Sequence, residues 1–184
     1  MNDFPGNSLN YLITGRPGVG KTTFIRRLAE ELEKRSGVPI AGFYTAEIRR
    51  EGKRQGFRIT TFDGLDKTFA RVDFPSPHRV SRYGVDLSAL EKVIAHLQSH
   101  SLPENGVWLI DEIGKMESLS PAFRHFVETI LDQPQRVVAT ISLFGGGWIG
   151  EVRNRSDVCI IELNERNRGE QLETLLRQLK EQLL

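Results

Sequence analysis

The amino-acid sequence predicts an α/β fold in which helices cover both faces of a mostly parallel sheet. Three observations predict it. Short apolar runs typical of strands alternate with helix-spaced apolar patterns along most of the chain. A glycine-rich loop joins the first strand to the first helix. Two β-prone segments, 41–50 and 57–62, follow one another without a helix between them, which predicts an added antiparallel β-hairpin.

Length and composition set the broad class of protein. The 184 residues fit one domain with a sizeable core, so we expect a single domain over residues 1–184. A formal net charge of +1 gives no overall attraction to nucleic acid or to a membrane surface. Cys159 is the only cysteine, which excludes an internal disulfide and fits a reducing compartment.

Targeting and membrane segments are not expected. Residues 1–10 lack a basic stretch followed by an apolar one. No segment approaches the roughly 20 apolar residues that a membrane-spanning helix needs. We therefore expect a cytoplasmic protein without membrane contact, and we expect it to be a monomer.

The first elements are predicted to be a strand, a loop, a helix and a hairpin. Residues 10–14 form a short apolar run stopped by glycine, as in a buried parallel strand. Residues 21–35 carry apolar side chains at helical spacing. The hairpin strands 41–50 and 57–62 are separated by the polar, glycine-flanked segment 51–56, which predicts the turn.

The alternation resumes after a stretch without a regular pattern. Residues 67–72 predict a third β-ribbon beside the hairpin, and residues 73–86 predict an irregular, mobile loop because they contain two prolines and a glycine. The remaining elements are expected to be a helix from Asp86 or Ser88 to Ser99, a strand at 107–110, a helix from Ser120 to Leu131, a strand at 136–141, a strand at 158–163 and a helix at 169–184.

A phosphate-binding motif lies between the first strand and the first helix. Residues 15–22 read Gly-Arg-Pro-Gly-Val-Gly-Lys-Thr, the full P-loop pattern in the context that it requires. The glycines allow N–H groups to face phosphate oxygens. Lys21 reaches the β- and γ-phosphates, and Thr22 supplies a hydroxyl for Mg²⁺. The expected nucleotide-binding residues are Gly15, Arg16, Pro17, Gly18, Val19, Gly20, Lys21, Thr22 and Thr23.

Two acidic residues, Asp111 and Glu112, follow the apolar run 107–110. At the carboxyl edge of the sheet, Asp111 can support the Mg²⁺ ion held by Thr22. Glu112 can orient and deprotonate a water for in-line attack on the γ-phosphate. An isolated acidic pair more often caps a helix, but the P-loop favours the catalytic interpretation. No Asn-Lys-x-Asp segment supports guanine specificity.

Three parts of the sequence together resemble the THEP-type nucleoside-triphosphatase family, also called cancer-related NTPases. They are the P-loop, the hairpin segments 41–49 (Ala-Gly-Phe-Tyr-Thr-Ala-Glu-Ile-Arg) and 56–59 (Gly-Phe-Arg-Ile), and residues 111–117 (Asp-Glu-Ile-Gly-Lys-Met-Glu). The hairpin and 111–117 are more specific than the P-loop. The family tends to show Asn-Arg-Asp toward the C-terminus, whereas residues 167–169 read Asn-Arg-Gly, so the resemblance assigns no role to this segment.

The resemblance implies a small RecA-like P-loop NTPase domain with an added catalytic glutamate. It implies slow, Mg²⁺-dependent hydrolysis of several nucleoside triphosphates, ATP, GTP, CTP and UTP among them, to diphosphate and phosphate. It also implies that the P-loop glycines, Lys21 and Thr22 bind phosphates and metal, that Asp111 supports the metal and that Glu112 is the base.

A further cation is expected near the γ-phosphate, where negative charge develops during the reaction. The candidates are Lys115, Arg124, Arg153, Arg155 and Arg168, although for any one of them a solvated surface charge is the better interpretation. Lys115 is taken as the catalytic candidate because it lies within 111–117. Ser142 is a candidate sensor of the γ-phosphate, provided that strand 136–141 lies between the strands of the P-loop and Asp111. An ordinary turn serine fits Ser142 equally.

Other polar residues are given ordinary roles. His78, His96, His100 and His125 are interpreted as surface or helix histidines without metal-ligand spacing, so no zinc site is expected. Glu117 can orient Lys115 or cap a helix, and 145–148 can form a flap or a wide turn. A solvated hairpin tip explains the basic residues better than nucleic-acid binding does; they are Arg49, Arg50, Lys53, Arg54 and Arg58.

Two other functions are compatible with a P-loop. A nucleotide or small-molecule kinase shares the motif, but a base for water at Glu112 opposes this reading because a kinase must exclude water. A nucleotide-dependent switch that binds RNA or a protein would use the basic hairpin. Hydrolysis of nucleoside triphosphates is the function that these residues favour.

Overall fold

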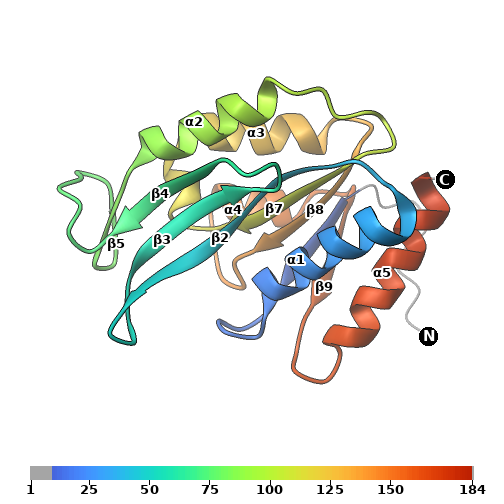
Figure 1. Ribbon diagram of the computed structural model, residues 1–184, viewed down its shortest axis with the longest axis horizontal. Helices are drawn as coiled ribbons and strands as arrows, with labels where there is room; N and C mark the ends of the chain where they lie inside the picture. The colour runs from blue at the N-terminus through green and yellow to red at the C-terminus, as the bar shows by residue number, and fades with distance from the viewer. Residues whose placement is uncertain (1–9, 184) are drawn as a thin grey trace.

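The computed structural model describes residues 10–183, which are built around one sheet of nine strands (Figure 1). The strands are β1 (Asn10–Thr14), β2 (Ile40–Arg50), β3 (Lys53–Thr61), β4 (Asp66–Arg71), β5 (Arg79–Val80), β6 (Tyr83–Val85), β7 (Val107–Ile113), β8 (Arg136–Ile141) and β9 (Val158–Glu162). The helices are α1 (Lys21–Glu31), the π-helical η1 (Leu32–Ser36), α2 (Leu87–Gln98), the 3-10 turn η2 (Glu117–Leu119), α3 (Pro121–Leu131), α4 (Trp148–Arg153) and α5 (Arg168–Leu183).

Two expectations fall wholly or partly outside the described residues. Residues 1–9 belong to the segment in which no targeting signal is expected, and Leu184 is the expected end of the last helix. Within residues 10–183, no helix combines the length and the apolar character needed to cross a lipid bilayer.

The sheet has a parallel half and an antiparallel half that meet at β2. The strand order is β5-β6-β4-β3-β2-β7-β8-β1-β9. From β2 to β9 in this order the strands pair in parallel, and from β5 to β2 they pair antiparallel. The predicted α/β fold with an added antiparallel part is therefore confirmed. β8 lies between β1, which leads into the P-loop, and β7, which carries Asp111.

Helices cover both faces of the sheet, as expected (Figure 1). On one face α1 and α5 bury apolar side chains such as Leu28 and Leu175 against the parallel strands. On the other face α2 and α3 bury Leu90 and Phe126. Each helix repeats apolar residues three or four positions apart, so one side of it leaves water while the other stays solvated. Two apolar cores thus hold the sheet from both sides.

The helices α2 and α3 begin where the sequence provides caps. The Asp86 carboxylate accepts a hydrogen bond from the Ala89 N–H (3.2 Å), and the Ser120 hydroxyl accepts one from the Phe123 N–H (3.2 Å). Pro121 occupies the first turn of α3, where its missing N–H is not needed. These contacts confirm the expected starts of both helices.

Several boundaries differ from the expectation in the first half of the chain. The expected helix 21–35 is α-helical only to Glu31 and continues as η1. The hairpin turn consists of Glu51 and Gly52, both at positive φ (51° and 74°), a pairing that lets two residues reverse the chain. β3 therefore begins at Lys53. The stretch 73–86, expected to be irregular, contains β5 and β6, which extend the antiparallel half.

Two further differences lie in the second half. α4 follows the glycine segment 145–147, where a flap or wide turn is expected. β7 continues beyond 110 to Ile113, with a shift of register against β8. Asp111 and Glu112 therefore lie within the last residues of the strand and not after it.

Gly42 permits close contact between β2 and β7, and its substitution tests that contact. Its φ is +128°, and a Cβ atom there would lie 1.9 Å from the Leu109 carbonyl oxygen. We expect Gly42→Ala to lower the free energy of unfolding by about 3 kcal/mol or more, because overpacking and backbone strain add. Urea denaturation measures the loss. Gly146→Ala is the control, because a Cβ there meets no atom within 4 Å; equal losses would contradict the prediction.

Candidate active site

The P-loop connects the buried strand β1 to the N-terminus of α1. Gly18 and Gly20 have φ angles of 79° and 98°, which glycine adopts without steric cost. Gly20 is the N-cap of α1 and brings no capping side chain, so the first N–H groups of the helix stay available to an anion. The Lys21 ammonium donates to the carbonyl oxygens of Gly15 (3.0 Å) and Arg16 (3.4 Å). N–H donors and one positive charge thus meet in this loop.

Asp111 is buried near the carboxyl end of β7, with 1% of its surface exposed. Its Oδ2 accepts hydrogen bonds from the Thr22 hydroxyl (2.8 Å) and from the hydroxyl and N–H of Thr45 (3.2 and 3.3 Å). Its Oδ1 accepts from the Thr140 hydroxyl (2.7 Å). These donors come from α1, β2 and β8, and they compensate for the burial of the carboxylate.

The sequence correctly predicts that Thr22 and Asp111 lie close together, but it predicts no role for Thr45 or Thr140. The available signals are weak. Thr45 lies in the Gly-Phe-Tyr-Thr segment of the resemblance, and Thr140 is a polar residue in the otherwise apolar run 137–141. Assigning either to Asp111 requires the strand order of the sheet.

The donor set of Thr22 and Asp111 fits a Mg²⁺ ion. A hydroxyl and a carboxylate whose oxygens are 2.8 Å apart are hard donors, and Mg²⁺ takes oxygen ligands, usually only one or two of them from protein carboxylates. In P-loop proteins the hydroxyl after the lysine and a strand-end aspartate hold this ion. The two residues are therefore the candidate metal site.

Glu112 lies next to Asp111 and is partly buried. The Ser142 hydroxyl, just after β8, donates to its Oε1 (3.0 Å). Burial raises the pKa of Glu112, and the nearby Asp111 charge raises it further, whereas the hydrogen bond from Ser142 and the charge of Lys21 oppose this rise. The condition set for Ser142, that its strand lies between β1 and β7, is met. Ser142 contacts the expected base directly.

Glu117 is the third acidic residue near the end of β7, beside Asp111 and Glu112. Its side chain is buried, and burial, together with the charges of Glu112 and Asp111, raises its pKa to about 8. A Cβ atom at Gly114 would lie 2.8 Å from Glu117 Oε2 and 3.1 Å from Glu112 Oε1, so both carboxyl groups close on this glycine. Glu117 is therefore mostly protonated at neutral pH while it faces the expected base.

The family model described as NTPase matches residues 10–176. The chain belongs to this family. "Nucleoside-triphosphatase THEP1" of Thermotoga sp. (strain RQ2) is 46% identical over 172 residues, which cover 94% of this chain and 96% of that protein. The human "Cancer-related nucleoside-triphosphatase" is 39% identical over 170 residues, covering 85% and 89%. The resemblance seen in the sequence is confirmed.

Two solved structures of the same kind share the fold. The crystal structure of THEP1 from the hyperthermophile Aquifex aeolicus superposes with a TM-score of 0.81 at 37% identity and covers 93% of this chain and 99% of that one. The solution structure of a human cancer-related nucleoside triphosphatase gives a TM-score of 0.78 at 36% identity, covering 94% and 97%. Both matches span the P-loop half and the antiparallel half of the sheet.

The basic residues proposed as the further cation in this NTPase family member differ in the contacts that they make. Lys115 is exposed and makes no side-chain hydrogen bond or ion pair with any residue between 10 and 183, so its catalytic role stays a prediction. Arg155 pairs with Asp132 and Asp157. Arg153 donates to the carbonyl oxygens of Ser142 (3.1 Å) and Leu143.

Arg168 lies on the P-loop. Its Nη1 donates to the Val19 carbonyl oxygen (3.1 Å), and a Cβ atom at Gly20 would lie 2.9 Å from the same nitrogen. It belongs to 167–169, which read Asn-Arg-Gly where the resemblance leads us to expect Asn-Arg-Asp. The arginine of that segment thus contacts the phosphate loop although the acid is missing.

The raised pKa of Glu117 predicts how stability depends on pH. Its folded pKa, about 8, lies above the ordinary 4.5, so the buried carboxyl destabilises the fold increasingly from pH 4.5 to about 8. We expect Glu117→Gln to match the wild type near pH 4.5 and to gain on it by up to about 1.4 kcal/mol per pH unit up to pH 8. Urea denaturation in EDTA measures this gain. Exposed Glu104→Gln is the control, and parallel wild-type and Glu117→Gln curves would contradict the prediction.

Proposed function

We propose that this member of the NTPase family hydrolyses nucleoside triphosphates to diphosphate and phosphate, with Mg²⁺ at Thr22 and Asp111 and with Glu112 as the base. The observation that carries the proposal is the end of β7. Asp111 is hydrogen-bonded to Thr22 of the P-loop, and the neighbouring Glu112 holds a second carboxyl group that is bonded to Ser142. Two adjacent carboxyl groups provide separate partners for the metal and for the attacking water.

Phosphate binding is assigned to residues 15–23 of the P-loop and α1. Their N–H groups, at the positive end of the α1 dipole, are suited to phosphate oxygens. Lys21 adds a positive charge for the β- and γ-phosphates. Thr22 and Asp111 would hold Mg²⁺, which neutralises charge on the phosphates when it is bound.

We assign to Glu112 the role of accepting a proton from the attacking water. Burial raises its pKa above that of an ordinary glutamate, which makes it a stronger proton acceptor. Its Oε1 is fixed by Ser142, so Oε2 is left to accept the proton of the water. The water oxygen then forms a bond to the γ-phosphorus as the bond to the β–γ bridging oxygen breaks, and the diphosphate leaves. A kinase would need to keep this water out.

Broad base specificity is supported by the loop beside the P-loop. A cavity of about 680 Å³ lies between residues 16–19 and residues 162–166, next to the phosphate site. The side-chain oxygens of Asn164 and Asn167 accept hydrogen bonds from backbone N–H groups of the same loop. The Asn167 side-chain nitrogen also donates to the Glu162 carbonyl oxygen (2.9 Å), so three of the four polar atoms of these two amides are engaged within the loop and are poorly placed to read the edge of a base. We infer that ATP, GTP, CTP and UTP are all accepted.

Nucleic-acid binding gains no support from the hairpin. Arg49 and Arg54 both pair with Glu47, and Arg58 pairs with Asp66, so part of the positive charge is matched locally. A cytoplasmic location, a monomeric state and a single domain over residues 1–184 stay predictions.

Phosphate release from the four nucleoside triphosphates tests the proposal directly. With Mg²⁺ present, we expect wild-type turnover of all four, and we expect Glu112→Gln to lower kcat by about 100-fold or more because the base is lost. Lys21→Ala should remove turnover by weakening nucleotide binding. Exposed Glu104→Gln should match the wild type. Native turnover in Glu112→Gln, or turnover only when an acceptor nucleoside is added, would overturn the assignment.

Ser142 is expected to act by positioning Glu112. Removal of its hydroxyl in Ser142→Ala loses one hydrogen bond to a charged acceptor, and we expect kcat to fall about tenfold with KM unchanged. Ser142→Thr keeps the hydroxyl and should recover most of the rate. Exposed Ser101→Ala is the control. A rise in KM with unchanged kcat would instead place Ser142 in nucleotide binding.

A further inference from the structure

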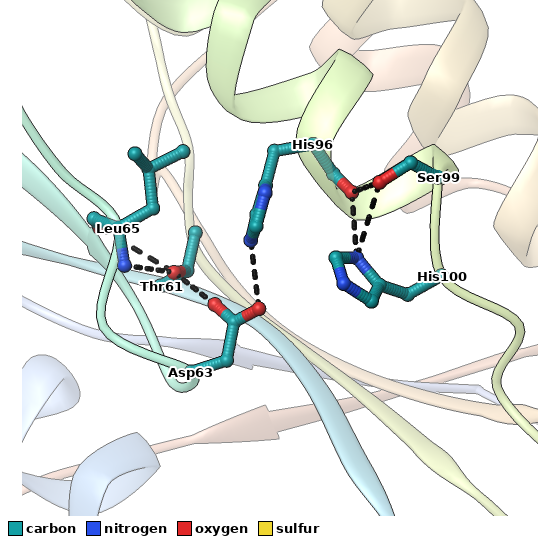
Figure 2. A network of polar contacts seen from close by, with 6 residues as sticks. All are labelled: Thr61, Asp63, Leu65, His96, Ser99 and His100. Atoms are coloured by element: carbon teal, nitrogen blue, oxygen red, sulfur yellow. Dashed lines mark hydrogen bonds and ion pairs between the residues drawn. The ribbon is translucent and has the colours of Figure 1, made fainter.

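Three potential metal ligands lie close together at the amino-terminal end of the parallel strands, opposite the end that carries the P-loop. Asp63 lies in the turn between β3 and β4, and this turn is held to the start of β2 by a hydrogen bond from the Phe62 N–H to the Gly42 carbonyl (3.2 Å). His96 lies in the last turn of α2, and His100 follows the end of that helix. Figure 2 shows the Asp63 carboxylate and the His96 ring facing each other, with the His100 ring beside them.

The expectation that these histidines share no metal-ligand spacing is wrong for His96 and His100. They are four residues apart, and His100, just beyond the end of α2, turns back so that the two ring centroids are 4.7 Å apart. Recognition from the sequence would still require Asp63, which reaches them only because β4 packs beside α2.

The separations between the three groups are close to those of a metal site. Asp63 Oδ2 lies 2.7 Å from His96 Nε2, and one ligand atom from each of the three residues lies within 4.8 Å of the others. Ligand atoms around a tetrahedral zinc ion, at bonds of about 2.0–2.2 Å, are about 3.3 Å apart. The side chains of Asp63 and His96 are 49% and 30% exposed, so small rotations can bring them to that geometry.

The atoms that would not bind the metal are already held by hydrogen bonds. His100 Nδ1 lies 2.9 Å from the His96 carbonyl oxygen, an acceptor, so it carries the proton and leaves Nε2 as a ligand. Asp63 Oδ1 accepts from the Thr61 hydroxyl, which leaves Oδ2 available. Such outer contacts orient ligands in metal sites.

Two features of the surroundings favour a bound cation. The ligands lie at the C-terminal end of α2, where the helix dipole is negative. A cavity of about 230 Å³ is lined by Asp63 and His100, which leaves room for a water as fourth ligand. Two imidazoles and a carboxylate, without sulfur, suit Zn²⁺ better than Mg²⁺ or Ca²⁺.

We propose that Asp63, His96 and His100 bind one Zn²⁺ ion, which joins the β3–β4 turn to the end of α2. The ion is structural. It lies at the amino-terminal end of the parallel strands, away from the P-loop. It holds the antiparallel half of the sheet against α2, the helix that covers this half.

Zinc titration of untagged, EDTA-stripped protein against a chromophoric chelator tests this site. We expect the wild type to bind one Zn²⁺ whose affinity falls at least tenfold in His100→Ala and in Asp63→Asn. His125→Ala removes an exposed histidine of α3 and should match the wild type. The amount of zinc bound by the acidic residues of the active site would be the same in all four proteins. The test therefore concerns only the zinc whose affinity falls when His100 is replaced.

Thermal unfolding provides the second readout. A ligand that binds only the native state raises Tm, so Zn²⁺ should raise Tm in the wild type and in His125→Ala, and it should raise Tm less in His100→Ala. Equal Tm values without metal would show that the variants fold alike. The proposal is overturned if the wild type binds no zinc or if His100→Ala binds it as tightly as the wild type does.

Discussion

The buried carboxylate of Asp111 is the interaction on which the rest of the site depends. A carboxylate without water is costly unless donors replace the lost hydration, and here they come from Thr22, Thr45 and Thr140. These threonines belong to α1, β2 and β8. Hydrogen bonds to this one side chain thus hold three elements in fixed positions relative to one another. They are the helix after the P-loop, the first strand of the hairpin and the central strand of the parallel half. Packing of the two apolar cores brings the elements together, but this polar contact defines their relative position at the active edge.

The three acidic side chains at this edge are kept distinct by their surroundings. Asp111 is surrounded by hydroxyl and N–H donors, whereas Glu117 is enclosed near Gly114 with other carboxyl groups for neighbours, and its pKa rises to about 8. Glu112 shares features of both, because burial raises its pKa while the Ser142 hydroxyl donates a hydrogen bond to it. Pairs of carboxyl groups whose environments differ in this way are how proteins separate charged and proton-carrying roles.

The sequence predicted what is encoded locally. The P-loop, the apolar run before Asp111 and the caps of α2 and α3 each lie within a few residues, so their patterns were sufficient. Thr140 and Ser142 were harder, because their roles depend on β8 lying between β1 and β7, which no local pattern encodes. β5, β6 and α4 are too short to show a period. Asp63 and His96 meet only through the packing of β4 beside α2.

The pairing of β1 with both β8 and β9 constrains how a newly synthesised chain acquires its nucleotide site. The P-loop is translated early, but the strand that leads into it has its two neighbours at residues 136–141 and 158–162. At the usual speed of translation the ribosome needs on the order of ten seconds to cover that interval. Until residues 136–141 have been translated, the run 10–14 has neither of its partner strands, and its second edge waits for residues 158–162. The nascent chain therefore depends on delayed, long-range pairing, and a chain released before residue 136 would retain the phosphate motif without either of the strands that flank β1.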